Sequence, residues 1–427
     1  MTAIGKNIVL FLDGTGNEYG DQNTNVVLLH DMAIKGEHQA VHYDPGVGTF
    51  SVSETLTGFG NFWQKALGLA FGFGMRETVT DAYAFVMKHY REGDRILIFG
   101  FSRGAYAARL LAALLHGIGI LADGGENLIE YGLRYLQMGE GNLDFRRLRG
   151  FSKQFRRCKA PRDIFLGLWD TVSSVSWAFD RQVYAYTTKN SSVSQVRHAV
   201  AIDEKRAFFT PNLYQGSGAQ EGRDYKEVWF AGVHSDVGGG YSSAQPLLSI
   251  VTLEWMLVEA RSCGLLVDEK RAWKLLINKS KSTQKLAPPL SKRHKSLQGP
   301  WWACEVWPKR MWFHRQKKWG WRWNCGRKRT IETGAIIHES VELRQSHSSY
   351  GPANLPTNLA IEDRVPFEYK DKTNSVRKMP AWSFSNQKSS TELVEETTAL
   401  SKMVAFVAVC FVAALYLVPI YLLWRLT

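Results

Sequence analysis

The chain has 427 residues, of which 45% are hydrophobic and 12% aromatic, and its formal net charge is +13. This apolar fraction is enough for a sizeable core, which excludes disorder over most of the chain, and 13 prolines without a fixed period exclude a collagen-like fibre. The five cysteines include no C-x-x-C pair, so we expect neither a disulfide framework nor a zinc ribbon, and we assign no metal or cofactor.

The positive charge is concentrated in one segment. Between Arg271 and Arg329 there are 17 Lys and Arg residues and one acid, Glu305, so this stretch carries +16 and the rest of the chain −3. Any partner inferred from charge therefore belongs to this segment and not to the whole protein.

Apolar runs and turn residues predict the elements in chain order. Apolar runs predict buried strands at 7–13, 95–99, 164–169 and 228–233, and a further short strand is expected at 39–43. Helical spacing predicts helices at 77–90, 104–115 and 246–263, and a loop is expected at 48–74. Strands that alternate with helices are typical of an α/β fold with a mostly parallel sheet and helices on both faces.

A strand–turn–helix pattern surrounds the strongest candidate nucleophile. The sequence Gly100-Phe101-Ser102-Arg103-Gly104 is a G-x-S-x-G placed between a predicted strand and an Ala-rich helix, the context of a nucleophile elbow. Side chains two residues before or after the serine would clash in such a turn, which explains both glycines. The helix N-terminus beneath Ser102 favours negative charge there.

A serine nucleophile needs a base, and the base needs an orienting acid. Asp170 and His234 each end a buried run, in the chain order Ser, Asp, His that this kind of fold uses. Parallel strands bring such residues to one edge of the sheet. Other bases and acids stay open at this point, namely His198, His338, Asp203 and Asp236, although Asp236 is better placed to hold the glycine-rich turn after His234.

Backbone N–H groups must bind the oxyanion that forms during ester cleavage. One is expected from Arg103, directly after the nucleophile. The loop Asp13-Gly14-Thr15-Gly16-Asn17 at the end of the first strand is expected to supply another through Gly14 or Thr15. This loop lacks the G-x-x-x-x-G-K-[ST] pattern, so nucleotide binding is not expected.

Seven motifs together resemble one family of α/β-hydrolases, which includes the phospholipase effectors of type VI secretion with a G-F-S-R-G elbow. The resemblance covers roughly residues 5–345 and lies in D-G-T-G-N (13–17), Y-D-P-G-V-G-T (43–49), G-F-S-R-G-A-Y-A-A-R (100–109), G-L-W-D-T-V (167–172), H-A-V-A-I-D-E-K-R (198–206), V-W-F-A-G-V-H-S-D-V-G-G-G-Y (228–241) and I-H-E-S-V (337–341). It implies a Ser-His-Asp esterase with phospholipase A activity, in which Ser102 is the nucleophile, Asp170 the acid and His234 the base. It also implies secretion-system or immunity proteins as partners, and delivery into another cell.

The basic segment also contains eight of the 15 tryptophans. Trp favours the membrane interface, and Lys and Arg attract anionic headgroups, so we expect lipid contact or a lid here. A solvated or partly core-packed insertion is the first alternative, and nucleic-acid binding is the less favoured second. The expected contact residues are Trp301, Trp302, Trp312, Trp319, Trp321, Trp323, Arg310, Lys317 and Lys318.

The C-terminal part has the composition of a membrane tail. Met403–Trp424 contains no charged residue, and 22 residues form a helix of roughly 33 Å, enough to cross a bilayer. We therefore expect a single-pass C-terminal anchor with the catalytic domain on the cytoplasmic side. The expected organisation is a catalytic core at 1–265, the basic insertion at 266–330, a return to the core at 331–370, a linker at 371–401 and the transmembrane tail at 402–427.

These features favour a serine hydrolase that cleaves acyl esters of membrane phospholipids. An esterase or thioesterase on soluble substrates is an alternative, because the triad itself does not select a lipid. A catalytically idle membrane-surface adaptor is a second alternative, which the intact triad and elbow disfavour.

Overall fold

The computed structural model describes most of the chain up to residue 382. The described residues are 5–14, 22–46, 71–138, 145–172, 183–214, 223–242, 248–281, 288–299, 301–305, 309–313, 318–371 and 373–382.

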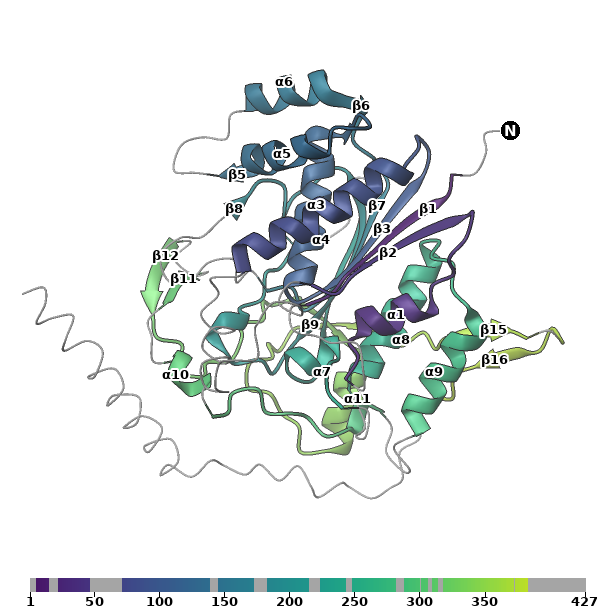
Figure 1. Ribbon diagram of the computed structural model, residues 1–427. Coiled ribbons are helices and arrows are strands. Elements are labelled where there is room, and N and C mark those ends of the chain that lie inside the picture. The colour runs from purple at the N-terminus through teal and green to yellow at the C-terminus, as the bar shows by residue number, and fades with distance from the viewer. Residues whose placement is uncertain are drawn as a thin grey trace, which may run out of the picture.

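A parallel sheet forms the centre of the molecule (Figure 1). In the described part of the chain it has eight strands in the order β14-β13-β10-β9-β7-β3-β1-β2, and every neighbouring pair is parallel. The α/β class expected from the sequence is therefore confirmed. The strands are β1 (Asn7–Leu12), β2 (Gln39–Asp44), β3 (Arg95–Phe101), β7 (Ile164–Trp169), β9 (Val193–Ala201), β10 (Asp224–Phe230), β13 (Ile336–His338) and β14 (Ala360–Glu362).

Helices cover both faces of this sheet, as expected. One core cluster lies under α3 (Phe71–His89), α4 (Arg103–Ile118), α5 (Ile129–Leu136) and α6 (Phe145–Phe155). The other lies under α1 (Asn25–Met32), α8 (Ser249–Ser262) and α9 (Glu269–Lys281). The remaining elements are the helices α7 (His234–Gly238), α10 (Trp301–Glu305) and α11 (Glu339–His347), the 3-10 turns η1 (Glu126–Leu128), η2 (Ala207–Phe209) and η3 (Pro288–Leu290), and the short strands β4 (Ile120–Leu121), β5 (Gln137–Met138), β6 (Arg156–Cys158), β8 (Val183–Tyr184), β11 (Lys309–Phe313), β12 (Lys318–Arg322), β15 (Glu368–Lys370) and β16 (Val376–Lys378).

Several boundaries differ from the sequence-based expectation. Helix α3 begins at Phe71, so residues 71–74 are helical and not part of a loop, whereas 47–70 lie outside the described residues. Strand β10 ends at Phe230, so three further residues separate it from His234. Helix α8 begins at Ser249, and Pro246 lies outside the described part.

The first part of the basic segment packs on the core. It forms α9, whose Ala272, Leu276 and Ile277 belong to the core cluster beneath α8. The expected linker also starts too early at 371, because β15 and β16 pair as a hairpin across that boundary and Met379 is buried. In the described residues, therefore, α9 and the region around Met379 pack on the core.

Within the described ranges no helix is long and apolar enough to cross a membrane. The expected tail at 403–424 lies outside the described residues, so a transmembrane tail stays a prediction.

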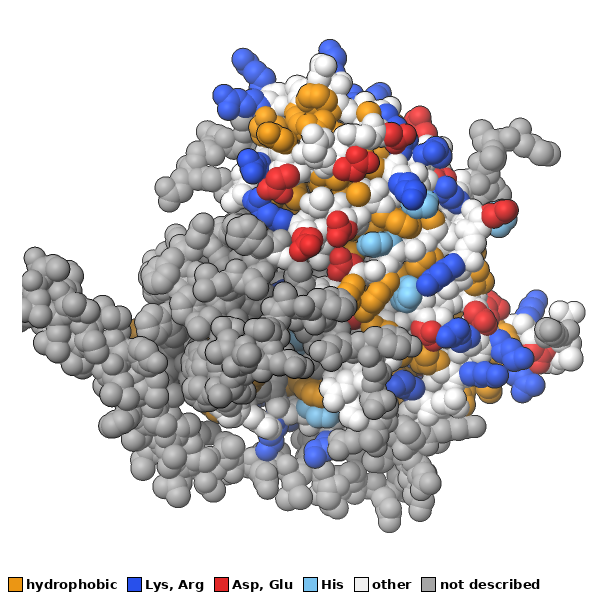
Figure 2. Space-filling view, viewed as in Figure 1, with side chains coloured by type: hydrophobic (Ala, Val, Ile, Leu, Met, Phe, Trp, Pro, Cys, Tyr) orange, Lys and Arg blue, Asp and Glu red, His pale blue; other side chains and the backbone are white. Residues whose placement is uncertain are grey.

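A basic surface covers the end of the molecule formed by α5 and α6, where Figure 2 shows Lys and Arg around hydrophobic side chains. Helix α6 has four basic residues and no acid, and Phe145, Phe155 and Tyr131 are exposed there. This patch was not expected from the sequence, where the positive charge is concentrated at 271–329 and α6 lies outside that segment.

Candidate active site

Ser102 occupies a tight turn between β3 and α4. Its φ and ψ are 59° and −119°, a conformation that costs free energy for a residue with a Cβ and that clusters at functional sites. A Cβ on Gly100 would lie 2.5 Å from the Gly104 oxygen, and one on Gly104 would lie 2.1 Å from the Leu12 oxygen. Close backbone approach therefore leaves no room for a side chain at either glycine.

Asp170 follows β7, the strand next to β3, and is fully buried. Like Ser102 it has a positive φ, 41°. Its carboxylate accepts the N–H of Ala201 at 3.0 Å and lies 2.5 Å from His234 Nδ1. The sheet thus delivers the predicted nucleophile and the predicted acid to the same edge.

His234 is the first residue of α7 and reaches Asp170 across the end of β9. Because a carboxylate only accepts, Nδ1 is assigned as the donor, which leaves Nε2 to act as a base. The ring lies between Phe101, with ring centres 4.6 Å apart, and Phe209, at 4.7 Å. These aromatic rings fix the orientation of the imidazole.

A residue that the sequence analysis did not select completes the surroundings of Asp170. Arg329, at the end of the basic segment, donates from Nη1 to Oδ1 at 2.6 Å and from Nη2 to Oδ2 at 2.9 Å. Burial alone would raise the pKa of Asp170, but the charge of Arg329 and the hydrogen bond from His234 hold it well below its usual range. Asp170 therefore stays ionised at neutral pH.

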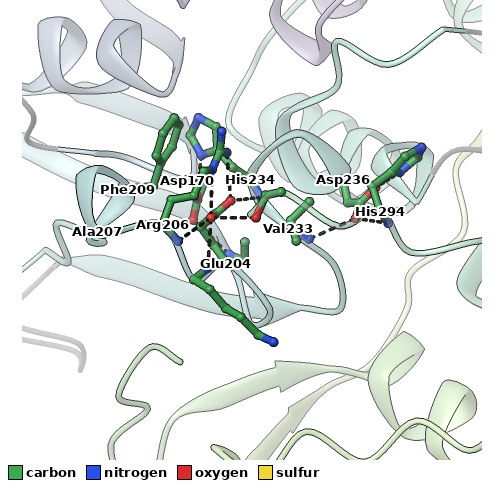
Figure 3. Close-up of polar contacts among 12 residues, drawn as sticks. Asp170, Glu204, Arg206, Ala207, Phe209, Val233, His234, Asp236 and His294 are labelled. Carbon is green, nitrogen blue, oxygen red and sulfur yellow. Dashed lines mark hydrogen bonds and ion pairs between the residues drawn. The ribbon is translucent and has the colours of Figure 1, made fainter. Parts of the chain in front are cut away.

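Glu204 and Arg206 form a second charged pair next to His234 (Figure 3). Glu204 accepts the backbone N–H of His234 at 3.2 Å, and Arg206 lies over the ring of Phe209. Burial opposes ionisation of Glu204, yet its bonds with Arg206 lower its pKa to about 2. Burial is the largest influence on His234 and lowers its pKa. The carboxylates of Asp170 and Glu204 raise this pKa and the charge of Arg206 lowers it, and the net effect is a pKa below the ordinary value.

The competing bases have other partners. His198 is buried, its Nε2 accepts the N–H of Thr171 at 3.1 Å, and its Nδ1 lies 2.7 Å from Glu227. His338 caps α11 by accepting the N–H of Ser340 at 3.2 Å. His198 is thus paired with a carboxylate, as His234 is, but its Nε2 already accepts a backbone N–H, and His338 serves as a helix cap.

The competing acids are structural as well. Asp203 accepts the N–H of Gly232 and the hydroxyl of Tyr350, both at 2.8 Å, and binds Arg293. Asp236 accepts the N–H of Val233 at 3.0 Å and so holds the turn into α7, as expected. Figure 3 shows Asp236 directed towards His294 and away from Asp170.

Two of the three expected oxyanion donors, Arg103 and Gly14, lie within the described residues. Arg103 opens α4, the position that the expectation requires. Gly14 does not fit its expected role, because its N–H donates to the Asp13 carboxylate at 2.6 Å. Thr15 lies outside the described residues.

The expected membrane-contact residues have different surroundings. Trp301 is half-buried against Phe209 and Arg206, so it packs beside the site and not on an open lipid-facing surface. Trp302 is half-buried, whereas Trp323 is 59% exposed. The remaining expected side chains lie outside the described ones, namely Trp312, Trp319, Trp321, Arg310, Lys317 and Lys318.

Comparison with known proteins identifies one family. The family model described as the type VI secretion (T6SS) phospholipase effector Tle1-like catalytic domain matches residues 6–259. The uncharacterized protein YEL023C of Saccharomyces cerevisiae is 34% identical over 221 residues, which are 48% of this chain and 32% of that protein. The match therefore spans about a third of that relative's length.

Two solved structures are also similar. An uncharacterized protein from Pseudomonas aeruginosa has 18% identity and a TM-score of 0.35, covering 65% of this chain and 51% of that one. The Tle1 effector bound to the VgrG spike of the type VI secretion system has 20% identity and a TM-score of 0.34, covering 56% of this chain and 52% of that one.

Proposed function

This chain belongs to the family of Tle1-like catalytic domains of type VI secretion phospholipase effectors, and from that premise we propose that it is a serine hydrolase cleaving acyl esters of membrane phospholipids. The observation that carries the proposal is the buried hydrogen bond between His234 Nδ1 and Asp170 Oδ2 next to the strained turn that holds Ser102. Nucleophile, base and acid then have the roles of a Ser-His-Asp triad.

In this mechanism His234 Nε2 removes the proton of Ser102 as Oγ attacks the ester carbonyl. The tetrahedral intermediate collapses, the ester C–O bond breaks, and the imidazolium returns the proton to the departing alcohol of the lysolipid. A water molecule, deprotonated by His234, then attacks the acyl-enzyme and releases the fatty acid while Ser102 regains its proton. Asp170 remains ionised and stabilises the imidazolium throughout.

Backbone donors bind the negative charge of the intermediate. The N–H of Arg103 is aided by the N-terminus of α4, where the helix dipole favours an anion. Gly14 and Thr15 were the two residues expected to supply a second donor. Because Gly14 already donates to Asp13, we propose Thr15 for this role.

Lipid is the proposed substrate because aromatic and basic residues are concentrated in the segment beside the site, where Trp323 is exposed. We also propose that 403–424 anchors the chain in a membrane, with the catalytic domain at 1–265 and 331–370 on the cytoplasmic side. Membership of an effector family supports delivery into another cell and secretion-system or immunity partners. Because the chain spans about half the length of the solved relatives, these roles are proposals for the whole protein.

The experiment compares the purified wild type with Ser102→Ala on vesicles of defined phospholipids, with the released fatty acids and lysolipids identified by mass spectrometry. Ser152→Ala, which removes another buried serine hydroxyl, is the matched control. We expect Ser102→Ala to lose at least a thousandfold in turnover and to lose labelling by a fluorophosphonate probe, while Ser152→Ala keeps both.

Other outcomes would overturn the proposal. Full activity of Ser102→Ala would exclude this nucleophile. Activity on short-chain esters that does not rise when lipid aggregates form would favour a soluble ester or thioester. Absence of probe labelling in the wild type would favour an idle adaptor on the membrane surface.

A further inference from the structure

Arg329 is held at Asp170 by contacts on both sides of its guanidinium. Besides the two bonds to the carboxylate, Nη1 donates to the carbonyl of Ala201 at 2.8 Å and Nη2 to that of Phe209 at 2.6 Å. The side chain is almost completely buried. A guanidinium whose two terminal nitrogens each bind a carboxylate oxygen and a carbonyl has one orientation available.

The backbone of Arg329 is fixed as firmly as its side chain. Asn354 donates to the carbonyl of Arg329 at 3.1 Å and to that of Ile202 at 3.2 Å, which ties the segment to the end of β9. Two residues further on, Ile331 is buried in the core cluster with Val200 and Ile202. A solvated basic face would show neither contact, so this end of the segment is part of the folded core.

Glu305, the single acid of the basic segment, makes the other attachment. Its carboxylate accepts the N–H of Ala207 at 2.7 Å, the side-chain amide of Asn324 at 2.7 Å and the N–H of Gly326 at 3.1 Å. Ala207 belongs to the loop that also carries Phe209. The segment between Glu305 and Arg329 is therefore anchored at both ends on the loop that follows β9.

The arrangement restricts the Asp170 carboxylate. Each oxygen accepts one N–H of Arg329, and the remaining partners are Ala201 on Oδ1 and His234 on Oδ2. Rotation of the carboxylate would break both bonds to Arg329. A planar, bidentate donor is suited to this task, whereas a lysine ammonium binds as a point charge.

The arrangement also places the positive charge of Arg329 close to His234. Arg329 Nη2 and His234 Nδ1 bind the same oxygen of Asp170. When His234 Nε2 is also protonated, two cations therefore bind one carboxylate. The other charged neighbours of the ring are Glu204 and Arg206 from the loop after β9, which form their own ion pair. Asp236 pairs with His294 on the other side of α7.

We propose that Arg329 is a positioning residue of this site, which locks the Asp170 carboxylate against His234 and opposes protonation of the imidazole through its charge. The end of the basic segment then contributes a residue to the proposed catalytic site. This inference rests on the proposed function for its kinetic consequences, but its electrostatic part concerns only the charged state of His234.

The test compares Arg329→Gln, which removes the charge, with Arg329→Lys, which keeps the charge and loses the bidentate geometry. We expect Arg329→Gln to move the acid limb of the kcat/KM profile up by about one pH unit, because the imidazolium loses a repulsive neighbour. We expect Arg329→Lys to keep the acid limb and to lower kcat about tenfold, because the carboxylate is no longer held in one orientation. Arg327→Gln, an exposed position two residues away with the same change of charge, is the matched control and keeps both quantities.

The proton resonance of His234 Nδ1, followed against pH by NMR, gives a second measurement that needs no substrate. An upward shift of its midpoint in Arg329→Gln supports the electrostatic role even if Ser102→Ala shows that the proposed reaction is wrong. An unchanged midpoint and acid limb in folded Arg329→Gln overturn that role. If Arg329→Gln does not fold, Arg329→Lys decides the positioning role, and a wild-type kcat for this variant overturns it.

Discussion

Ser102 and Asp170 follow directly paired residues of adjacent strands, since Phe101 of β3 is in register with Trp169 of β7. The N–H of Ser102 donates to the carbonyl of Trp169 at 3.0 Å, and both residues have a positive φ. One backbone register thus sets the separation of the proposed nucleophile and acid. Each strained residue costs of the order of 1–3 kcal/mol, which the surrounding sheet must offset.

The elbow tolerates no side chain at Gly104. A Cβ there would lie 2.1 Å from the oxygen of Leu12 and 2.5 Å from that of Asp13, and both are backbone atoms that cannot move alone. We expect Gly104→Ala to lower the free energy of unfolding by about 2–3 kcal/mol, measured by urea denaturation, and to abolish hydrolysis. Gly150→Ala is the control, because nothing lies within 4 Å of its Cβ position in α6 and alanine favours a helix by about 1 kcal/mol. Wild-type stability of Gly104→Ala would contradict the close approach.

The sequence predicted strands mainly from apolar runs, although β2 was expected despite its Gln39 and His42. Strand β9, which lies between β7 and β10, was not predicted because Gln195, Arg197 and His198 interrupt its pattern. Arg197 is buried because Asp224 and Glu259 bind its guanidinium, and His198 because it pairs with Glu227. These partners come from other segments, and a local pattern cannot reveal them.

The candidate site likewise contains residues that a local sequence pattern predicts and one residue that it does not. Ser102, Asp170 and His234 were identified because each follows a recognisable run and because their order along the chain fits a triad. Arg329 is one of 17 Lys and Arg residues in its segment, and composition cannot distinguish one buried guanidinium among them. Glu305, the single acid of the stretch, contacts Ala207, Asn324 and Gly326, so even this conspicuous residue does not identify Arg329.

The pH dependence of the reaction follows from the burial of His234. Burial lowers its pKa below the ordinary value of about 6.5, and the charges of Asp170 and Glu204 only partly oppose this. The base must be neutral to accept the proton of Ser102, so activity persists as the pH falls below 6.5 and is lost only at the pKa of His234. We expect the acid limb of kcat/KM on a non-ionising ester to lie below pH 6.5. A limb at or above pH 6.5 would show that the site does not disfavour the imidazolium.

Removal of the Glu305 carboxylate tests the attachment of the basic segment. Glu305→Ala leaves the N–H groups of Ala207 and Gly326 and the amide of Asn324 without their buried acceptor. We expect a loss of about 3 kcal/mol in the free energy of unfolding and faster proteolysis after residue 305. We also expect a lower kcat, because Arg329 loses part of its support. Glu37→Ala, an exposed acid, is the control; equal proteolysis of the two variants would contradict the anchoring role.

His338 couples stability to pH independently of catalysis. Its ring stacks on Phe230, and burial, aided by the charge of Arg364, lowers its pKa to about 3. In the unfolded chain His338 becomes protonated near pH 6.5, whereas in the native state it stays neutral. Stability is therefore lost as the pH falls from 6.5 towards 3. His338→Asn keeps an N-cap for α11 without this titration. We expect the decrease in the free energy of unfolding between pH 7 and pH 5 to be about 2 kcal/mol smaller in the variant, from urea denaturation at both pH values. Parallel pH dependences would mean that His338 titrates normally in the folded protein.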